Sequence, residues 1–290
     1  MRATPVPGHR KATREKGPMQ AASHPSPTAD GQPVARGERR GPTALRAVTR
    51  RRASASGVDV VRVFDEDPDL LAGIDPAAID LLRRRVVVPT LSVDAGPWPA
   101  PVENTSQSSV GLLVLDGLMI RSLHLAGRDC PELIGAGDLL RPWDCEREGS
   151  VAMSVSWTAL ESTTLAVLDE RFAALICRFP TIMAALLSRS VQRSRTLAFL
   201  LGIAHIRHAD TRLQTLLWHL ADRWGRVTPA GVHLPLRLTH ETLAQLVCMR
   251  RPTASTTLRG LASAGEVARR RDGTWLLTGQ PPSFLHCRSA

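Results

Sequence analysis

The sequence predicts an α+β protein with three parts: an N-terminal β-roll of the double-stranded β-helix type, a long helix and a C-terminal winged helix-turn-helix. Short apolar runs separated by glycine-bearing turns occupy the first half of the 290 residues, as in a roll or small barrel. Pro180 then opens a long segment without glycine until Gly202. Two further helical patterns and a hairpin signal follow near the carboxyl end.

Charge is distributed unevenly along the chain. Residues 1–57 hold 12 of the 37 Lys and Arg but 3 of the 27 Asp and Glu, so the remainder is nearly balanced. This segment has almost no large apolar side chains, and we expect a disordered basic tail or a dispensable extension. The expected parts are the tail at 1–57, the β-roll domain at 58–180, a dimerisation helix at 181–208, the winged helix-turn-helix domain at 209–281 and a flexible C-terminus at 282–290.

Several classes of protein are excluded by the motifs that the sequence lacks. The five cysteines are scattered without a C-x-x-C pair, which excludes a disulfide framework, a zinc knuckle and an iron–sulfur site. No apolar stretch approaches the roughly 18 residues of a membrane span, and we expect a cytoplasmic protein. No P-loop, nucleophile elbow or HExxH motif occurs, so we expect no enzymatic activity and no cofactor. His205 and His208 have a spacing compatible with a metal but no third ligand, so no metal site is expected.

The roll region is predicted as a helix followed by short strands. Asp75 should cap a helix with Pro76 in its first turn. The apolar runs predict strands over 85–91, 151–157 and 163–169. Asp116-Gly117 stands between two apolar runs and predicts a two-residue hairpin.

The second half of the chain reads mainly as helices. After a helix over 171–179, the segment from Pro180 carries a narrow apolar seam, formed by Met183, Leu187, Val191, Leu197 and Leu201. Such a seam favours pairing with a second copy, and the alternative is a helix lying across its own roll. The next helix should begin with Asp210 as N-cap and end near Trp224-Gly225. A strand over 231–238 follows, and Thr239 should cap a helix over 241–247.

Thr239 to Leu261 has the pattern of helix, tight turn and helix. Leu243, Leu246 and Val247 can pack on a second apolar face, formed by Ala254, Leu258 and Leu261. The outer face of the second helix is basic and hydroxyl-rich, and no acid occurs between residues 242 and 265. Such a face can contact DNA bases and phosphates. Asp272-Gly273 predicts a following hairpin, a wing that places Arg269, Arg270 and Arg271 for phosphate contact.

The segment LTHETLAQLVCMRRPTASTTLRGLASAGEVARRRDGTWLLTG resembles the winged helix-turn-helix of Crp/Fnr-type bacterial transcription regulators. The resemblance extends over about residues 60–280, with a cyclic-nucleotide-binding-like roll before the dimerisation helix. It implies a homodimer that binds a near-palindromic operator in double-stranded DNA and contacts RNA polymerase. The expected base-reading residues are Arg251, Pro252 and Thr256. Further contacts are expected from Arg250, Thr253, Ser255, Arg259 and Thr239.

Two residues depart from the family pattern near the recognition helix. Cys248 stands where relatives often have glycine in the turn, and it would be strained if this position requires a positive φ. We expect a small buried residue there, with a redox role as the alternative. Pro252 replaces a base-contacting acid, so the operator sequence does not carry over from relatives.

The roll departs further from relatives that bind cyclic nucleotides. Arg141-Pro142 stands where the family has Gly-Glu, and Met153 stands where it has the phosphate-binding arginine. Cyclic AMP is therefore not expected as the effector, and Arg141 and Trp143 are weak candidates for binding an unidentified one. The alternative function is a small-ligand receptor or protein-interaction module whose DNA-binding domain has degenerated.

Overall fold

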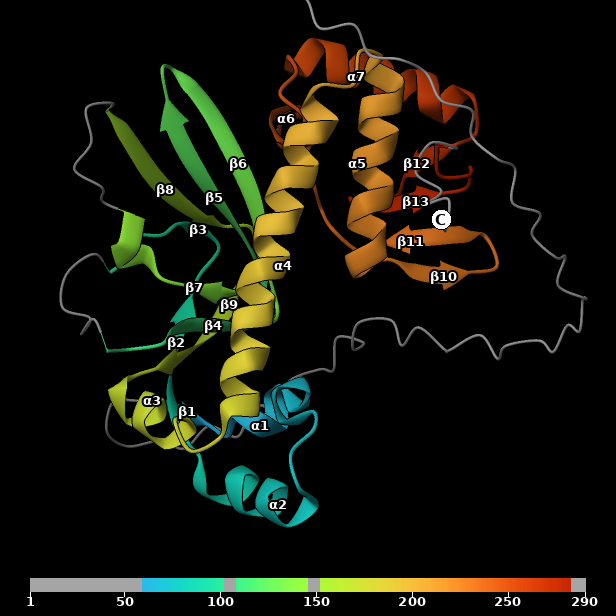
Figure 1. Cartoon of the computed structure of the whole chain (residues 1–290). Helices are drawn as coiled ribbons and strands as arrows, with labels where there is room; N and C mark the ends of the chain where they lie inside the picture. Colours follow the sequence, from blue (N-terminus) through green and yellow to red (C-terminus); the bar gives the residue numbers. More distant parts are fainter. Residues whose placement is uncertain (1–58, 102–107, 146–151, 283–290) are drawn as a thin grey trace, which may run out of the picture. The chain divides into compact units, whose positions relative to one another are not determined.

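The computed structural model describes residues 59–101, 108–145 and 152–282, and Figure 1 shows how their elements are arranged. The predicted α+β class is confirmed, because a two-sheet roll precedes a long helix and a C-terminal winged helix-turn-helix. The predicted disordered tail at 1–57 lies outside the described residues, as does nearly all of the predicted flexible C-terminus at 282–290.

Short helical elements lie between the first two strands of the roll. They follow strand β1 (Val60–Val61) and comprise α1 (Val63–Glu66), a 3-10 turn (Pro68–Leu71) and α2 (Pro76–Arg85). Asp75 occupies the N-cap position of α2, but its side chain makes no capping hydrogen bond. The strand predicted over 85–91 begins too early, since the N–H of Val86 still bonds to the carbonyl of Leu82. Strand β2 runs from Val88 to Val93 instead.

The roll consists of two antiparallel sheets. One has the strand order β1-β2-β9-β4-β7, and the other has the order β3-β8-β5-β6. Apolar side chains from both sheets meet between them, and Met119, Ile134 and Leu165 are fully buried there. The remaining strands of the roll are β3 (Gly96–Pro97), β4 (Gly111–Asp116), β5 (Leu118–Leu125), β6 (Arg128–Gly135), β7 (Leu139–Leu140), β8 (Met153–Ala159) and β9 (Thr163–Leu168).

The hairpin predicted at Asp116-Gly117 is wrong, because β4 and β5 belong to different sheets. Gly117 has φ +102°, and a Cβ on it would lie 2.6 Å from the Cα of Thr163. Glycine is therefore required where the chain crosses closely past β9 from one sheet to the other. The hairpin of this region joins β5 to β6 at Ala126-Gly127, where both residues have positive φ as a tight hairpin turn requires.

The long helix α4 (Pro180–Ala204) follows α3 (Glu170–Ile176), which Asp169 caps by accepting the N–H of Phe172. One face of α4 packs on the preceding part of the chain through buried Ile182 and Leu186. Among the described residues no single helix is long and apolar enough to span a membrane. Together α3 and α4 have sufficient length and composition, but they meet at a bend of 120°.

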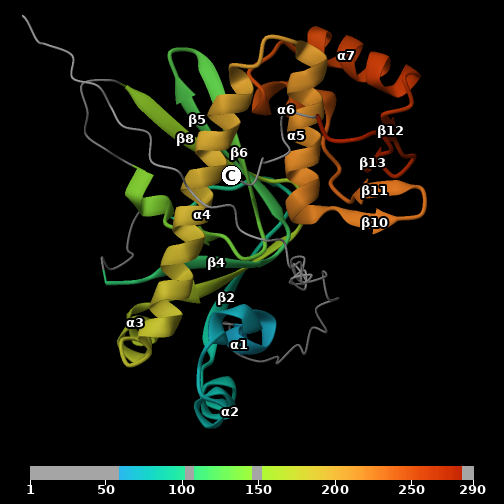
Figure 2. The ribbon, with the colours of Figure 1, turned by 45° about the vertical axis from the view of Figure 1, so that its right-hand side comes forward.

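Helix α5 (Ala209–Trp224) runs beside α4 in both ribbon views (Figures 1 and 2). His208, not Asp210, occupies its N-cap position, because Asp210 lies within the first turn and accepts the N–H of Thr211. The predicted strand 231–238 ends at Leu234, the last residue paired with β13, before Pro235, which has no N–H to donate. The C-terminal elements are β10 (Arg226–Thr228), β11 (Gly231–Leu234), α6 (His240–Leu246), α7 (Arg251–Ser263), β12 (Val267–Arg269) and β13 (Trp275–Leu277).

The C-terminal elements share one apolar core with the roll. This core joins the buried leucines of α5, α6 and α7 to Leu118, Ile120 and Leu133 of β5 and β6. Polar contacts reinforce the junction, since Arg223 of α5 lies 2.8 Å from Asp138. The position of α7 is thereby tied to the roll through α5 and α6.

Candidate DNA-binding interface

Helices α6 and α7 are joined by a tight turn. Thr239 caps α6 as predicted, because its hydroxyl accepts the N–H of Thr242. Cys248 lies in the turn with φ +53°, so the position does demand the left-handed conformation that glycine adopts more easily. The expectation that Cys248 is buried is wrong, because its side chain is exposed. The turn leaves that side chain outside the contact between the helices.

The contact between α6 and α7 is apolar and closely packed. Ala244 is fully buried beside Leu243 and Val247, and it is the small residue that lets the helix backbones approach. The opposing face of α7 is buried through Ala254, Leu258 and Leu261. Burial of each leucine contributes about 1.5–3 kcal/mol. This packing fixes which face of α7 remains outside.

The outer surface of α7 carries most of the residues predicted to read DNA. Arg250 is its N-cap, and Pro252 fits the first turn, where backbone N–H groups have no intrahelical acceptor. Ser255 differs from the others, because it is half-buried and its hydroxyl lies 3.1 Å from Nδ1 of His240. The exposed members are Arg250, Arg251, Pro252, Thr253, Thr256 and Arg259.

The predicted wing is present as the antiparallel hairpin β12–β13. Asp272 holds its turn by accepting hydrogen bonds from the N–H and the hydroxyl of Thr274, and these bonds lower the pKa of Asp272. The guanidinium of Arg269 lies 5.8 Å from the ring centre of Trp275, a buried residue of the wing strand β13. Arg270 and Arg271 are exposed in the turn.

Two residues of this surface were missed in the sequence: His240 and Glu241. Burial lowers the pKa of His240, and the positive charges of Arg269, Arg251 and Arg259 lower it further. Arg251 and Arg259 belong to α7 and Arg269 belongs to the wing, so two elements bring positive charge near His240. Glu241 places a carboxylate 3.7 Å from Nε of Arg251, so the surface is not free of acid. The sequence feature that could have indicated both residues is their position in the first turn of α6, directly after the predicted N-cap Thr239.

Comparison with known proteins identifies this part of the chain. Residues 211–278 match the family of Crp-like helix-turn-helix domains. They form a Crp-like domain. Among curated proteins, none matches the sequence.

The fold of the roll together with the Crp-like domain also occurs in solved structures. A mutant of CooA from Carboxydothermus hydrogenoformans has 20% identity and a TM-score of 0.51, with 66% of this chain and 83% of that chain covered. A cyclic nucleotide-binding domain containing protein from Listeria monocytogenes has 16% identity and a TM-score of 0.53, with 65% and 88% covered. FixK2 from Bradyrhizobium japonicum has 14% identity and a TM-score of 0.50, with 67% and 94% covered. At these identities the likeness concerns the fold.

A cavity of about 330 Å³ lies between the roll and α4. Three guanidiniums line it, those of Arg121, Arg141 and Arg193. Arg141 bonds to Asp144 and to the carbonyl of Ser109, 2.6 Å away, so much of its hydrogen-bonding capacity is used within the protein. Trp143 does not line this cavity, but Arg141 lies over its ring at 5.6 Å.

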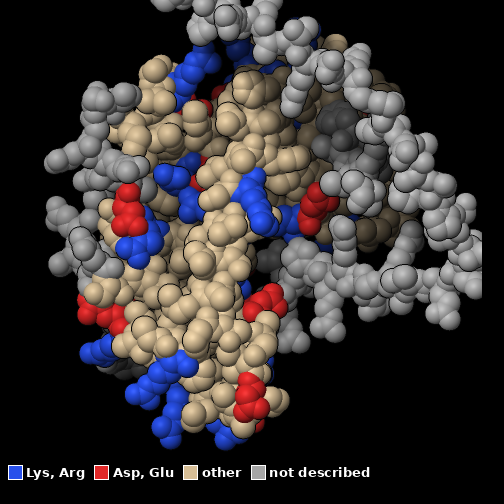
Figure 3. Space-filling model, in the orientation of Figure 1, with Lys and Arg blue, Asp and Glu red and all other residues tan. Residues whose placement is uncertain are grey.

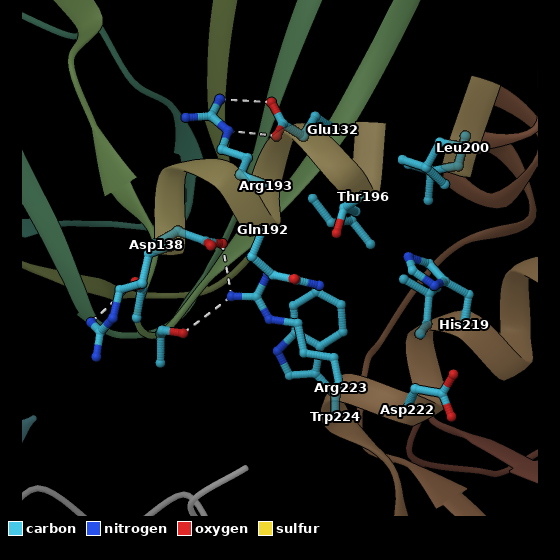
Figure 4. Close-up of a pocket in the computed structure, with 16 residues that line it drawn as sticks. Glu132, Asp138, Gln192, Arg193, Thr196, Leu200, His219, Asp222, Arg223 and Trp224 are labelled. Carbon is cyan, nitrogen blue, oxygen red and sulfur yellow. Dashed lines mark hydrogen bonds and ion pairs between the residues drawn. The ribbon is translucent and has the colours of Figure 1, made fainter. Parts of the chain in front are cut away.

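A second cavity, of about 540 Å³, lies where the roll, α4 and the Crp-like domain meet (Figure 4). Its arginines are already neutralised: Arg193 by Glu132, Arg223 by Asp138, and Arg189 by Asp67 outside the cavity. Burial lowers the pKa of His219 in its wall, against the opposing effect of Asp222. The cavity offers neutral hydrogen-bonding groups more than free charge.

No group of three His, Cys, Asp or Glu side chains in the described part of the chain is placed to hold a metal ion.

Proposed function

We propose that the protein is a sequence-specific, DNA-binding transcription regulator of the Crp/Fnr type, acting as a homodimer in the cytoplasm. The observation that carries the proposal is the exposed outer face of α7, which carries Arg251 and Arg259, in a Crp-like domain whose wing strand β12 carries the exposed Arg269. Positive charge gathered from a helix and a wing suits a phosphate backbone, and an exposed helix face suits the major groove. The function needs no catalysis.

Within this interface, α7 enters the major groove with Arg251, Pro252 and Thr256 toward the bases. Arg251 can donate two hydrogen bonds to guanine, and Pro252 offers only apolar contact. Arg250, Thr253, Arg259 and Thr239 contact phosphates or neighbouring bases, and Ser255 contributes chiefly by holding His240. The wing residues Arg269, Arg270 and Arg271 contact phosphates across the groove.

The homodimer forms along α4. Its apolar seam is exposed in the single chain, and Leu187 and Leu201 are each 65% exposed. The face along α4 in the space-filling view carries few charges (Figure 3). Pairing two such helices would bury the seam and place two α7 helices about 34–36 Å apart, one turn of DNA. A near-palindromic operator follows from this two-fold symmetry.

The three functions are assigned to the expected domains: a β-roll at 58–180, dimerisation at 181–208 and DNA binding at 209–281. The helix of the dimerisation segment is α4, which ends at Ala204 and not at residue 208. An effector, if the regulator takes one, occupies the cavity beneath α4. Its three arginines are each paired with a carboxylate, Arg121 and Arg193 with Glu132 and Arg141 with Asp144. Nε of Arg121 is nevertheless buried there without a hydrogen-bond partner among the described residues, so a ligand with a hydrogen-bond acceptor suits the cavity. Contact with RNA polymerase completes the proposal.

The competing function is a receptor whose Crp-like domain no longer binds DNA. Duplexes recovered by selection from genomic fragments should bind the protein with an affinity that falls by about 10³–10⁵-fold between 50 and 200 mM salt. A receptor without DNA-binding function would recover no common two-fold sequence and would show only weak, sequence-independent retention. That second result would reject the proposal.

A further inference from the structure

Three side chains on the sheet β3-β8-β5-β6 form a hydrogen-bonded Ser–His–Asp chain away from the DNA-binding surface. Nδ1 of His124 lies 2.7 Å from Oδ1 of Asp129. Nε2 of the same ring lies 2.7 Å from Oγ of Ser156. The three residues come from the neighbouring strands β5, β6 and β8, which lie side by side in Figure 1.

The strand register explains why these side chains meet. His124 pairs directly with Asp129 across β5 and β6. Ser156 pairs with Ser122, which lies two residues before His124 on β5. Because side chains alternate between the faces of a sheet, all of these residues point to the same face. The regular register of the antiparallel sheet therefore brings the three side chains within hydrogen-bonding distance of one another.

We propose that Ser156 is a nucleophilic serine, activated by His124, that is acylated by activated esters. The carboxylate of Asp129 accepts the N–H at Nδ1 and so leaves Nε2 as the acceptor of the Ser156 hydroxyl proton. This is the order of groups by which a base and an orienting acid activate a serine. The His124 side chain is 38% exposed, so a reagent in solution can reach the site.

A cavity of about 640 Å³ beside Ser156 provides a place for the acyl group. Its lining is mostly apolar and includes Trp98, Val155, Trp157 and prolines of the segment before β4. The side chains of Val155 and Trp157 alternate with that of Ser156 and point to the other face of the sheet, so an acyl group on Oγ reaches this space around the open edge of β8. Unlike the two cavities at α4, this cavity has no Asp, Glu, Lys or Arg among the described residues that line it. A small, uncharged aliphatic or aromatic acyl group suits it.

The outer edge of β8 offers an N–H donor beside the serine. Strand β3 pairs with β8 only at Thr158 and Ala159, so residues 153–155 have no strand partner on that side within the described chain. The carbonyl of Trp157 faces this edge, because it accepts the N–H of Trp98. Backbone groups alternate in direction along a strand, so the N–H of Val155 faces the same edge. It can stabilise negative charge on the carbonyl oxygen of an ester.

The step is a single acyl transfer. Oγ of Ser156 forms a bond to the carbonyl carbon while its proton passes to Nε2 of His124. The tetrahedral species then collapses, the bond to the leaving oxygen breaks, and that alcohol or phenol takes the proton from His124. Acyl-serine and the free alcohol are the products, and no redox partner or turnover is required.

Incubation with p-nitrophenyl acetate tests the proposal by p-nitrophenolate release and by mapping the acetylated peptide. The full-length protein should release one equivalent and carry acetyl on Ser156. Ser156→Ala should lose that label, and His124→Ala should slow labelling by about 10²-fold or more. Ser122→Ala, which changes the serine paired with Ser156, should label like wild type.

Acetyl found on the exposed Cys130 of β6 but not on Ser156 would overturn the proposal. Equal labelling of Ser156 in wild type and His124→Ala would do so as well, because the serine would then react without its base. Thermal melting of each variant shows whether the fold is kept. Asp129→Asn, which preserves the size of the side chain, gives a second measure of activation should His124→Ala fail to fold. The measurement uses no DNA, so its result is independent of the proposed regulator function.

Discussion

Two residues of the α6–α7 unit act against its stability or its proposed function. Cys248 holds a backbone conformation that costs a non-glycine residue about 1–2 kcal/mol. Glu241 holds Arg251 beside a carboxylate, although Arg251 is a proposed base-reading residue. The sequence shows the positions of both residues along the chain, but the pairing of Glu241 with Arg251 depends on how α6 crosses α7. A contact between two helices of this kind therefore could not be predicted from sequence patterns.

Cys248→Gly should stabilise the protein by about 0.5–1 kcal/mol, because glycine adopts positive φ without the steric cost of a Cβ. The free energy of unfolding from urea titration measures this change. Cys248→Ala keeps the Cβ and removes the thiol, so it should give no comparable gain. Equal stabilisation by both variants would show that the thiol, and not the backbone conformation, is responsible.

Glu241→Gln should raise affinity for DNA about two- to fivefold, because it frees Arg251 and removes a charge that phosphates repel. Titration of a bound duplex at fixed salt measures the change. Asp80→Asn makes the same change of net charge on α2, away from the Crp-like domain, and should have little effect. If Asp80→Asn raised affinity equally, net charge would explain the result and Glu241 would have no local role.

Among the elements, the helices were predicted more closely than the turns of the roll. The cap at Thr239, the start of α4 at Pro180 and the end of α5 at Gly225 follow from local chemistry that the sequence displays. The change of sheet at Gly117 cannot be predicted in this way, because an Asp-Gly pair is compatible both with a hairpin and with a crossing from one sheet to the other. The approach of Thr163 decides between them, and that contact is long-range.

Helix α4 has two faces with different tasks. Arg189 and Arg193 form ion pairs with Asp67 and Glu132, which hold α4 against the preceding part of the chain. The apolar seam of α4 is exposed. Leu187→Glu combined with Leu201→Glu should convert a dimer into a monomer in sedimentation at micromolar concentration, because paired helices would bring buried charges together. Val227→Glu, at a residue 89% exposed outside α4, should remain a dimer. A monomeric wild-type protein would contradict the role given to α4.

The contact between α4 and α5 should make stability depend on pH. The ring of His219 lies 4.4 Å from that of Phe199, and burial lowers the pKa of His219. Arg223 lowers it further and Asp222 opposes the change. The unfolded chain then binds the proton more readily, so the free energy of unfolding should fall as pH drops below about 6.5. His219→Gln should flatten this fall in urea titrations between pH 7.5 and 5.5, and an unchanged slope would argue against the assignment.

For the whole molecule, fold class and the order of its parts follow from the sequence, while the shared core between roll and Crp-like domain does not. Leu118, Ile120 and Leu133 look like ordinary strand residues in the sequence, yet they complete the core under α5 and α6. The cavity between these parts likewise arises only in the folded chain. Because α7 is tied to the roll through this core, the proposed DNA-reading face is held in a fixed position relative to the roll.

The most direct test of the DNA-reading face compares Arg251→Ala with Arg270→Ala in selection of bound duplexes from a randomised pool. Arg251→Ala should weaken binding and relax preference by about 1–3 kcal/mol at one base pair of each half-site. Arg270→Ala, in the turn of the wing, should weaken all sequences alike and leave the selected sequence unchanged. Identical, uniform losses for both variants would contradict the placement of α7 in the major groove.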